Sequence, residues 1–248
     1  MKGQGKHTPD TVKIGGFQRV SLIDYPGKLT SIVFVTGCNM RCPFCQNKDL
    51  ILKKDENLVL YSEELVLEQL KKSRNFLDAV EITGGEPTLQ SGLKEFIRRC
   101  KELGLAVKLD TNGLNPQILK DLLGEGLLDY VAMDIKSSLE PDKYAAAAGV
   151  SSSQILGKVM ESIKVIMNSA PDYEFRTTVV PSLVEIEDLA KIAKKIEGAN
   201  AYYIQQFNPK DTLDPKFSKF TPYPLEALIH ERNGIKDKGL IKKCEVRF

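Results

Sequence analysis

The sequence is poor in the residues that usually complete a zinc site. It has two histidines, His7 and His230, and five cysteines, three of which lie between positions 38 and 45. A structural zinc site takes four protein ligands and usually pairs one CxxC motif with another or with histidines. Both histidines lie far from the clustered cysteines in the sequence, so zinc would need a distant fourth ligand. The odd number of cysteines also argues against a disulfide framework and indicates a reducing compartment.

Long apolar runs and a charge of one sign are also absent. No stretch of about 18 or more apolar residues could span a membrane, and the first ten residues lack the apolar centre of a secretory signal. The chain has 35 Lys and Arg against 33 Asp and Glu, a net charge of +2. This balance provides no general field for nucleic acid or an anionic membrane. We therefore expect a cytoplasmic protein with neither as partner. Its 248 residues, 42% of them hydrophobic, can fill one core.

The three clustered cysteines, Cys38, Cys42 and Cys45, form a CxxxCxxC run. Three thiolates at this spacing can hold three irons of a cubane iron-sulfur cluster and leave the fourth iron open. An open iron is what a cluster needs if it is to bind and reduce another molecule. Zinc with a distant fourth ligand and unmetallated thiols are the alternatives at this point. Cys100, on an apolar helix face, and Cys244, near the end, are not expected to bind metal.

Apolar runs alternate with helical patterns along the chain. Each of the first five predicted strands is followed by a predicted helix, and helix starts are predicted at Ser62 and at Asn115 before Pro116. Strands that alternate with helices predict a parallel sheet with right-handed crossovers. Six runs rich in β-branched and aromatic residues are the predicted strands, at 31–35, 79–83, 106–110, 130–135, 173–180 and 201–206.

The number of strand-helix units limits the fold. Six units at this spacing use up the chain before the eight units of a closed barrel, which take about 250 residues, could be completed. We predict an α/β fold, an incomplete (β/α)6 TIM-like barrel with an open side; periodicity alone leaves a doubly wound sheet as the alternative. The expected organisation is an N-terminal extension and hairpin at 1–29, a partial barrel at 30–207, and a C-terminal extension at 208–248 packed on the same domain.

Polar motifs follow three of the predicted strands, at the carboxyl ends where a barrel places its site. In Gly84-Gly85-Glu86-Pro87 the glycines let backbone groups approach a ligand, and Glu86 can accept hydrogen bonds from an ammonium group. Asp110-Thr111-Asn112-Gly113 and Asp134-Ile135-Lys136 close the next two strands. Together these groups would form a polar mouth for a zwitterion, and the two aspartates could share a small cation. Taken singly, each motif is also typical of a turn or a surface ion pair.

Two further residues extend the candidate site. Arg176 is a charge inside an otherwise apolar strand. Because breaking a buried ion pair costs about 3–5 kcal/mol, we expect Arg176 to contact an acid or the ligand; a solvated edge position is the alternative. Gln205 and Gln206 end the sixth strand, and alternation is expected to turn only one of them inward. His7 and His230 lie outside every motif and are expected to be structural or solvated.

The cysteine run, with Phe44 just before its last cysteine, resembles that of the radical S-adenosylmethionine (radical SAM) enzymes. The Gly84–Pro87 motif follows about forty residues later. It resembles the motif with which that superfamily contacts the methionine amino group of S-adenosylmethionine. The segment Ser21-Leu-Ile-Asp-Tyr-Pro-Gly-Lys28 resembles more narrowly the glycyl-radical activating enzymes, and most closely the activating proteins of anaerobic ribonucleoside-triphosphate reductase. The resemblance covers about residues 14 to 209.

This resemblance implies a radical SAM oxidoreductase that holds a [4Fe-4S] cluster on its three clustered cysteines and binds S-adenosylmethionine. Reductive cleavage would form a 5'-deoxyadenosyl radical, which takes a hydrogen atom from a glycine of a large partner, expected to be anaerobic ribonucleotide reductase. A flavodoxin or ferredoxin would supply the electron, and no catalytic protein acid or base is expected. The expected cofactor-binding residues are Phe44, Gly84, Gly85, Glu86, Asp110, Thr111, Asn112, Asp134, Lys136, Arg176 and Gln205.

Two other classes of function stay open on the sequence. One is a radical SAM enzyme that acts on a small molecule such as a nucleoside or deazapurine. The other is a non-catalytic metal-binding interaction protein. Gln205 and Gln206 stand where related activases often carry a histidine toward the ribose. The two glutamines differ from that wider pattern but resemble the reductase-activating subgroup. The residue that contacts the ribose therefore stays open.

Overall fold

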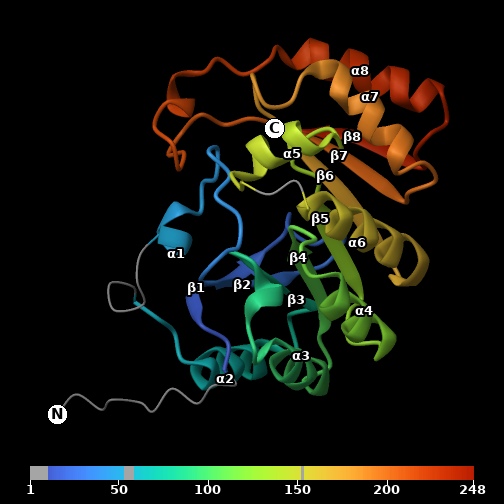
Figure 1. Ribbon diagram of the computed structural model, residues 1–248. Helices are drawn as coiled ribbons and strands as arrows, with labels where there is room; N and C mark the ends of the chain where they lie inside the picture. Colours follow the sequence, from blue (N-terminus) through green and yellow to red (C-terminus); the bar gives the residue numbers. More distant parts are fainter. Residues whose placement is uncertain (1–10, 53–58, 152–153) are drawn as a thin grey trace.

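A computed structural model describes residues 11–52, 59–151 and 154–248 (Figure 1), so His7 lies outside the described residues. Among the described helices, none combines the length and the apolar character needed to cross a membrane. The elements are β1 Ile14–Ser21, β2 Thr30–Val35, α1 Lys48–Leu52, α2 Glu63–Ser73, β3 Ala79–Gly84, η2 Pro87–Leu89, α3 Leu93–Glu102, β4 Ala106–Thr111, α4 Pro116–Gly124, β5 Tyr130–Asp134, α5 Pro141–Ala148, α6 Ile155–Ser169, β6 Tyr173–Val179, α7 Ile186–Lys195, β7 Ala201–Gln206, η3 Phe217–Lys219, α8 Leu225–Asp237 and β8 Lys243–Arg247.

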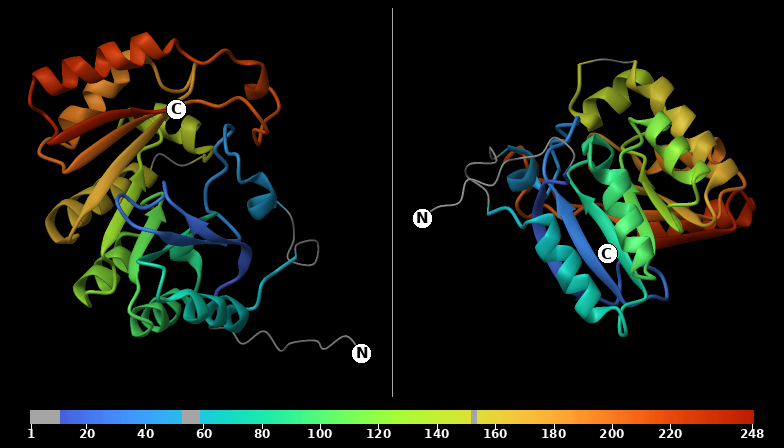
Figure 2. Two further views of the ribbon diagram at one scale, coloured as in Figure 1. Left: turned by 180° about the vertical axis from the view of Figure 1, so that it is seen from behind. Right: turned by 90° about the horizontal axis from the view of Figure 1, so that it is seen from below.

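The described strands form one sheet of eight whose spatial order follows the chain from β1 to β8. β1 runs antiparallel to β2, and every later pair of neighbours is parallel. Helices α2, α3, α4, α6 and α7 lie along the outer side of the curved sheet (Figure 2). The predicted α/β partial barrel is therefore confirmed, with its six strands as β2 to β7. The doubly wound alternative is wrong, because the strand order never reverses.

Alternation along each strand gives the sheet two different faces. Val80 and Ile82 of β3 belong to the main apolar core, together with Phe96 of α3. Glu81, between them, points to the opposite face, because successive side chains of a strand alternate. It is in register with Lys108 of β4. The outer face therefore packs on the helices as an apolar core, whereas the inner face carries buried charges.

A chain of ion pairs crosses this inner face. Lys108 is 1% exposed, and its Nζ lies 3.0 Å from Glu81 Oε1 and 2.8 Å from Asp110 Oδ1. Burial alone would raise the pKa of Asp110, but the positive charges of Arg176 and Lys108 hold that pKa well below its usual range. Burial and the negative charge of Asp110 raise the pKa of Glu81 to about 8. Lys108 therefore keeps two carboxyl groups together in the interior.

The connection between β1 and β2 closes one end of the inner face. Lys28 N donates to Tyr25 O at 3.1 Å, and Gly27 has φ +72°, as the Pro-Gly sequence requires in a type II turn. The Tyr25 side chain is buried against Tyr130 of β5, with ring centroids 5.3 Å apart. β1 and β2 form an antiparallel hairpin, whose second strand lies beyond the expected extension at 1–29.

Two predicted helix starts differ in how they are capped. Ser62 precedes α2, and its hydroxyl accepts a hydrogen bond from Leu65 N at 3.2 Å, which satisfies one free amide of the first turn. Asn115 precedes α4 as predicted, but its side chain does not cap that helix. Its Nδ2 donates instead to Thr88 O at 3.1 Å. Asn115 thus connects the turn after β4 to the turn after β3.

We expect Lys108→Met to lower the free energy of unfolding by about 3–5 kcal/mol, because it would leave the buried carboxyl groups of Glu81 and Asp110 without their shared cation. Urea denaturation measures the change. Lys72→Met is the control, because Lys72 and Glu68 are paired with both side chains 61% exposed, and such pairs contribute at most about 1 kcal/mol. Equal losses in the two variants would show that the buried pairing of Lys108 has no special importance.

Candidate functional site

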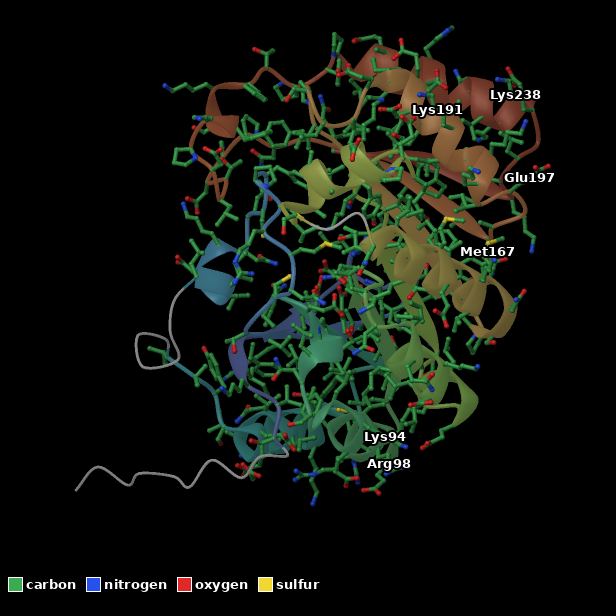
Figure 3. All side chains as sticks on the ribbon, in the orientation of Figure 1. Lys94, Arg98, Met167, Lys191, Glu197 and Lys238 are labelled. Atoms are coloured by element: carbon green, nitrogen blue, oxygen red, sulfur yellow. The ribbon has the colours of Figure 1, made fainter. Side chains whose placement is uncertain are left out.

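The carboxyl ends of the parallel strands surround a pocket of about 500 Å³. A pocket of this volume is typical of small-molecule sites. Figure 3 shows side-chain oxygen atoms crowded in the middle of the molecule, whereas Lys94, Arg98 and Lys238 lie at its periphery. The predicted site residues that line the pocket are Cys38, Cys42, Phe44, Cys45, Gly84, Gly85, Asp110, Thr111, Asn112, Asp134, Lys136, Arg176 and Gln205.

The three clustered cysteines lie on the loop between β2 and α1. Burial raises the pKa of Cys42 to about 12 and also raises the pKa of Cys38. A metal that binds there must therefore displace protons. Within the described ranges, no three His, Cys, Asp or Glu side chains are placed to hold one metal ion. Three cysteine thiols that line one pocket are a donor set that fits a cluster, in which each thiolate binds a separate iron.

Gly84 and Gly85 are required by the close approach of two backbones. Gly85 N donates to Val35 O at 2.9 Å, and Glu86 N donates to Gly37 O at 2.8 Å. A Cβ atom on Gly85 would lie 1.9 Å from Gly37 O, and Gly84 has φ +113°. Both glycines line the pocket, and their lack of a side chain lets the turn after β3 pack directly on the start of the cysteine loop.

Glu86 is placed differently from the expectation that it would receive an ammonium group. It is fully buried and lies outside the set of residues that line the pocket. Its Oε1 accepts from Thr88 N at 3.1 Å, from Thr88 Oγ1 at 2.6 Å and from Thr111 Oγ1 at 2.8 Å, while Oε2 accepts from Asn112 N at 2.7 Å. Four donors inside the protein occupy the carboxylate. Glu86 therefore holds the turns after β3 and β4 together.

Arg176 joins two acids at the base of the pocket. Its Nε donates to Asp134 Oδ1 at 2.7 Å, and its Nη1 donates to Asp110 Oδ2 at 2.9 Å. Lys136 Nζ donates to the other oxygen of Asp134 at 2.8 Å. Burial opposes charge on Asp134, but Arg176 and Lys136 outweigh it and hold the pKa of Asp134 below its usual value. The prediction that Arg176 contacts an acid is confirmed, and the pocket carries fixed charges of both signs.

Both glutamines at the end of β7 line the pocket, although only one was expected to face it. Gln206 Nε2 donates to Tyr223 O at 2.9 Å. The pocket continues past the end of β7 to Phe207 and Asn208, so it borders residues from both sides of the strand end. The Gln206 amide is engaged by Tyr223 O, and the cofactor contact of Gln205 stays a prediction.

The chain that follows β7 packs on the cysteine loop, which sequence patterns did not reveal. Gln46 Nε2 donates to Asn208 O and to Lys210 O, each at 3.2 Å. Asp214 N donates to Pro43 O at 2.9 Å. These contacts use main-chain carbonyl groups, which every residue carries, so no side-chain pattern could have found them. His230, in contrast, lies on α8 and does not line the pocket.

Comparisons with known proteins agree with this geometry. The model of the radical SAM superfamily matches residues 32–193. A candidate glycyl-radical enzyme activating enzyme of Methanocaldococcus jannaschii, MJ1227, is 36% identical over 228 residues, which are 91% of this chain and 92% of that protein. The pyruvate formate-lyase-activating enzyme of Clostridium pasteurianum is 29% identical over 94% of this chain and 95% of its own.

A solved structure supports the same fold. Streptococcus suis SuiB, crystallised with S-adenosylmethionine, matches 85% of this chain with a TM-score of 0.66 and 14% sequence identity. This chain spans 48% of the SuiB chain, about half of its length. The likeness therefore concerns the fold of the partial barrel alone.

We expect Gly85→Ala to destabilise the protein by about 3 kcal/mol, at the upper end of overpacking effects, because its Cβ would meet the carbonyl of Gly37. It should also reduce the iron retained per chain, since Gly37 immediately precedes the cysteine run. Urea denaturation measures the free energy of unfolding, and iron analysis after anaerobic reconstitution measures the iron content per chain. Gly124→Ala is the control, because a Cβ there would have no neighbour within 4 Å. Wild-type stability and iron content in Gly85→Ala would contradict the role assigned to the close contact.

Proposed function

The chain belongs to the radical SAM superfamily, and from this premise we propose that it is an activating enzyme that generates a glycyl radical on a partner enzyme. The cofactors of this superfamily are a [4Fe-4S] cluster and S-adenosylmethionine. The observation that carries the proposal is that three cysteine thiols and the polar strand ends meet in one pocket. The similarity to MJ1227 and to a pyruvate formate-lyase-activating enzyme supports the activase class over other radical SAM reactions.

When bound, the cluster and S-adenosylmethionine supply one-electron reduction and hydrogen-atom abstraction, so the protein contributes binding and orientation. Cys38, Cys42 and Cys45 would hold three irons. Asp134 and Lys136 present opposite charges to the pocket, which suits the carboxylate and ammonium groups of a methionine moiety. Their charges are set before the ligand enters, because Arg176 fixes Asp134 from behind. The cost of organising the site is therefore met during folding.

Apolar side chains border the same pocket and limit the entry of water. Met40, Phe44, Ile51 and Phe207 line it, and all four are buried. Exclusion of water strengthens the electrostatic contacts within a site and protects a reactive species from side reactions. Phe44 thus has an apolar contact role in this proposal, as its place before Cys45 predicts.

Anaerobic ribonucleoside-triphosphate reductase is the partner that we propose, with a flavodoxin or ferredoxin as the electron donor. The proposal rests on the 21–28 segment, which connects β1 and β2. Asp24 in this segment lines the pocket, while the adjacent Leu22 and Ile23 are 77% and 87% exposed. Exposed apolar side chains that adjoin a site favour contact with another protein. The proposed partner would contact this connection at the amino end of β2.

The decisive experiment mixes the reconstituted protein, S-adenosylmethionine and a reductant with a candidate reductase under anaerobic conditions. We expect a glycyl-radical EPR doublet on the reductase. Deoxyadenosine formation without the doublet would refute this partner and indicate another substrate, such as a small molecule. Zinc in an anaerobically prepared sample, with no cubane EPR signal after reduction, would refute the enzymatic function altogether.

Cys42→Ala should abolish both the cluster spectrum and the cleavage of S-adenosylmethionine, because it would remove one of three iron ligands. Cys100→Ala is the matched control: Cys100 is also buried but belongs to the core of α3 and does not line the pocket. It should retain four irons per chain. Iron content, visible absorption and deoxyadenosine release are the measurements, and normal turnover of Cys42→Ala would rule out the ligand assignment.

A further inference from the structure

We propose that the side-chain amide of Asn112 donates a hydrogen bond to the sulfur of Cys38 and thereby raises the reduction potential of the iron-sulfur cluster. The inference rests on the proposed function, since it concerns a ligand of the cluster. Asn112 Nδ2 lies 3.8 Å from Cys38 Sγ, within reach of an N–H···S hydrogen bond. Asn112 follows β4, whereas Cys38 follows β2, so the contact connects two strand ends across the pocket.

The orientation of the Asn112 amide is determined by its surroundings. Its Oδ1 accepts a hydrogen bond from Leu114 N at 3.0 Å. A backbone N–H can only donate, so the oxygen of the amide must face Leu114 and the NH2 group must face the cysteine loop. The NH2 group has two hydrogens. One is donated to Asn39 Oδ1 at 2.8 Å, and the other is directed toward Cys38 Sγ.

Asn112 is also held firmly in this position. It is 6% exposed, and its backbone N donates to Glu86 Oε2 at 2.7 Å. Glu86 is itself engaged by Thr88 and Thr111. The buried carboxylate that was expected to bind the cofactor therefore orients the residue that donates to a cluster ligand.

The three cysteine thiols differ in the hydrogen bonds that their sulfur atoms receive. Cys38 Sγ receives a second hydrogen bond, from Met40 N at 3.4 Å. Among the residues that the structure describes, none donates a hydrogen bond to the sulfur of Cys42 or Cys45. Hydrogen bonds to cluster sulfurs are one of the factors that set cluster potentials. Cys38 is therefore the ligand through which the protein can adjust the potential.

The direction of the effect follows from charge. Reduction adds an electron and makes the cluster and its thiolates more negative, and an N–H donor stabilises the more negative state more strongly. Removing the Asn112 donor should thus make reduction harder. We expect Asn112→Ala to lower the midpoint potential by about 59 mV, which is a tenfold change in the equilibrium constant for a one-electron step.

Asn112→Asp provides a second, nearly isosteric variant. It keeps an oxygen that can accept from Leu114 N but brings a carboxylate instead of an NH2 group to Cys38. The potential should therefore fall further than in Asn112→Ala. Asn115→Ala is the matched control, because Asn115 lies on the same turn but donates to Thr88 O and not to a sulfur. Its potential should equal that of the wild type.

The potentials are measured on the reconstituted proteins by redox titration followed by EPR, without S-adenosylmethionine, together with iron content. The order wild type, Asn112→Ala, Asn112→Asp from highest to lowest potential supports the proposal. Unchanged potentials in both variants at four irons per chain would overturn it. Loss of the cluster from both variants, with retention in Asn115→Ala, would also overturn it and assign Asn112 to cluster assembly. Failure of the wild type to hold a cluster would instead refute the proposed function.

Discussion

The pocket depends on the neutralisation of charge inside the sheet. Asp110 lies between Lys108 and Arg176, and Arg176 continues the chain of contacts to Asp134. An unpaired buried charge is costly, so each of these groups requires its neighbours. Because the groups lie on β4, β5 and β6, their pairing also favours the register in which the carboxyl ends of these strands meet. The same contacts leave Asp134 and Lys136 as charged groups at the pocket surface.

A second set of contacts holds the cysteine loop against the strand ends. The Gly84–Gly85 backbone packs on Val35 and Gly37, and Asn47 Nδ2 donates to Gly84 O at 2.8 Å. Glu86 receives hydrogen bonds from the turn after β4. In this chain the Gly-Gly-Glu-Pro motif therefore acts mainly as a junction between three strand ends. Precise placement of the thiols follows from it, because the motif restrains the loop from which they project.

The periodic elements were the part of the fold most accessible to prediction. The six strands β2 to β7 have strong β-branched and aromatic runs, and the turn at Gly27 has a local chemical signature. The pairing of β1 and β8 with the sheet was not predicted. β1 begins Ile-Gly-Gly and shows no regular alternation of buried and exposed residues. β8 is short, and only its Cys244 is fully buried, in the same core as Leu228 and Ile235 of α8.

The sequence by itself determined the class of chemistry, because the CxxxCxxC spacing and the motifs after β3, β4 and β5 are local patterns. Only the tertiary structure decided which of these residues face the pocket. Glu86 turned inward to four donors, both glutamines reached the pocket, and the chain after β7 covered the cysteine loop. The physical reason is that hydrogen-bond satisfaction and burial depend on residues distant in sequence, and several of those contacts are made by main-chain groups that all residues share.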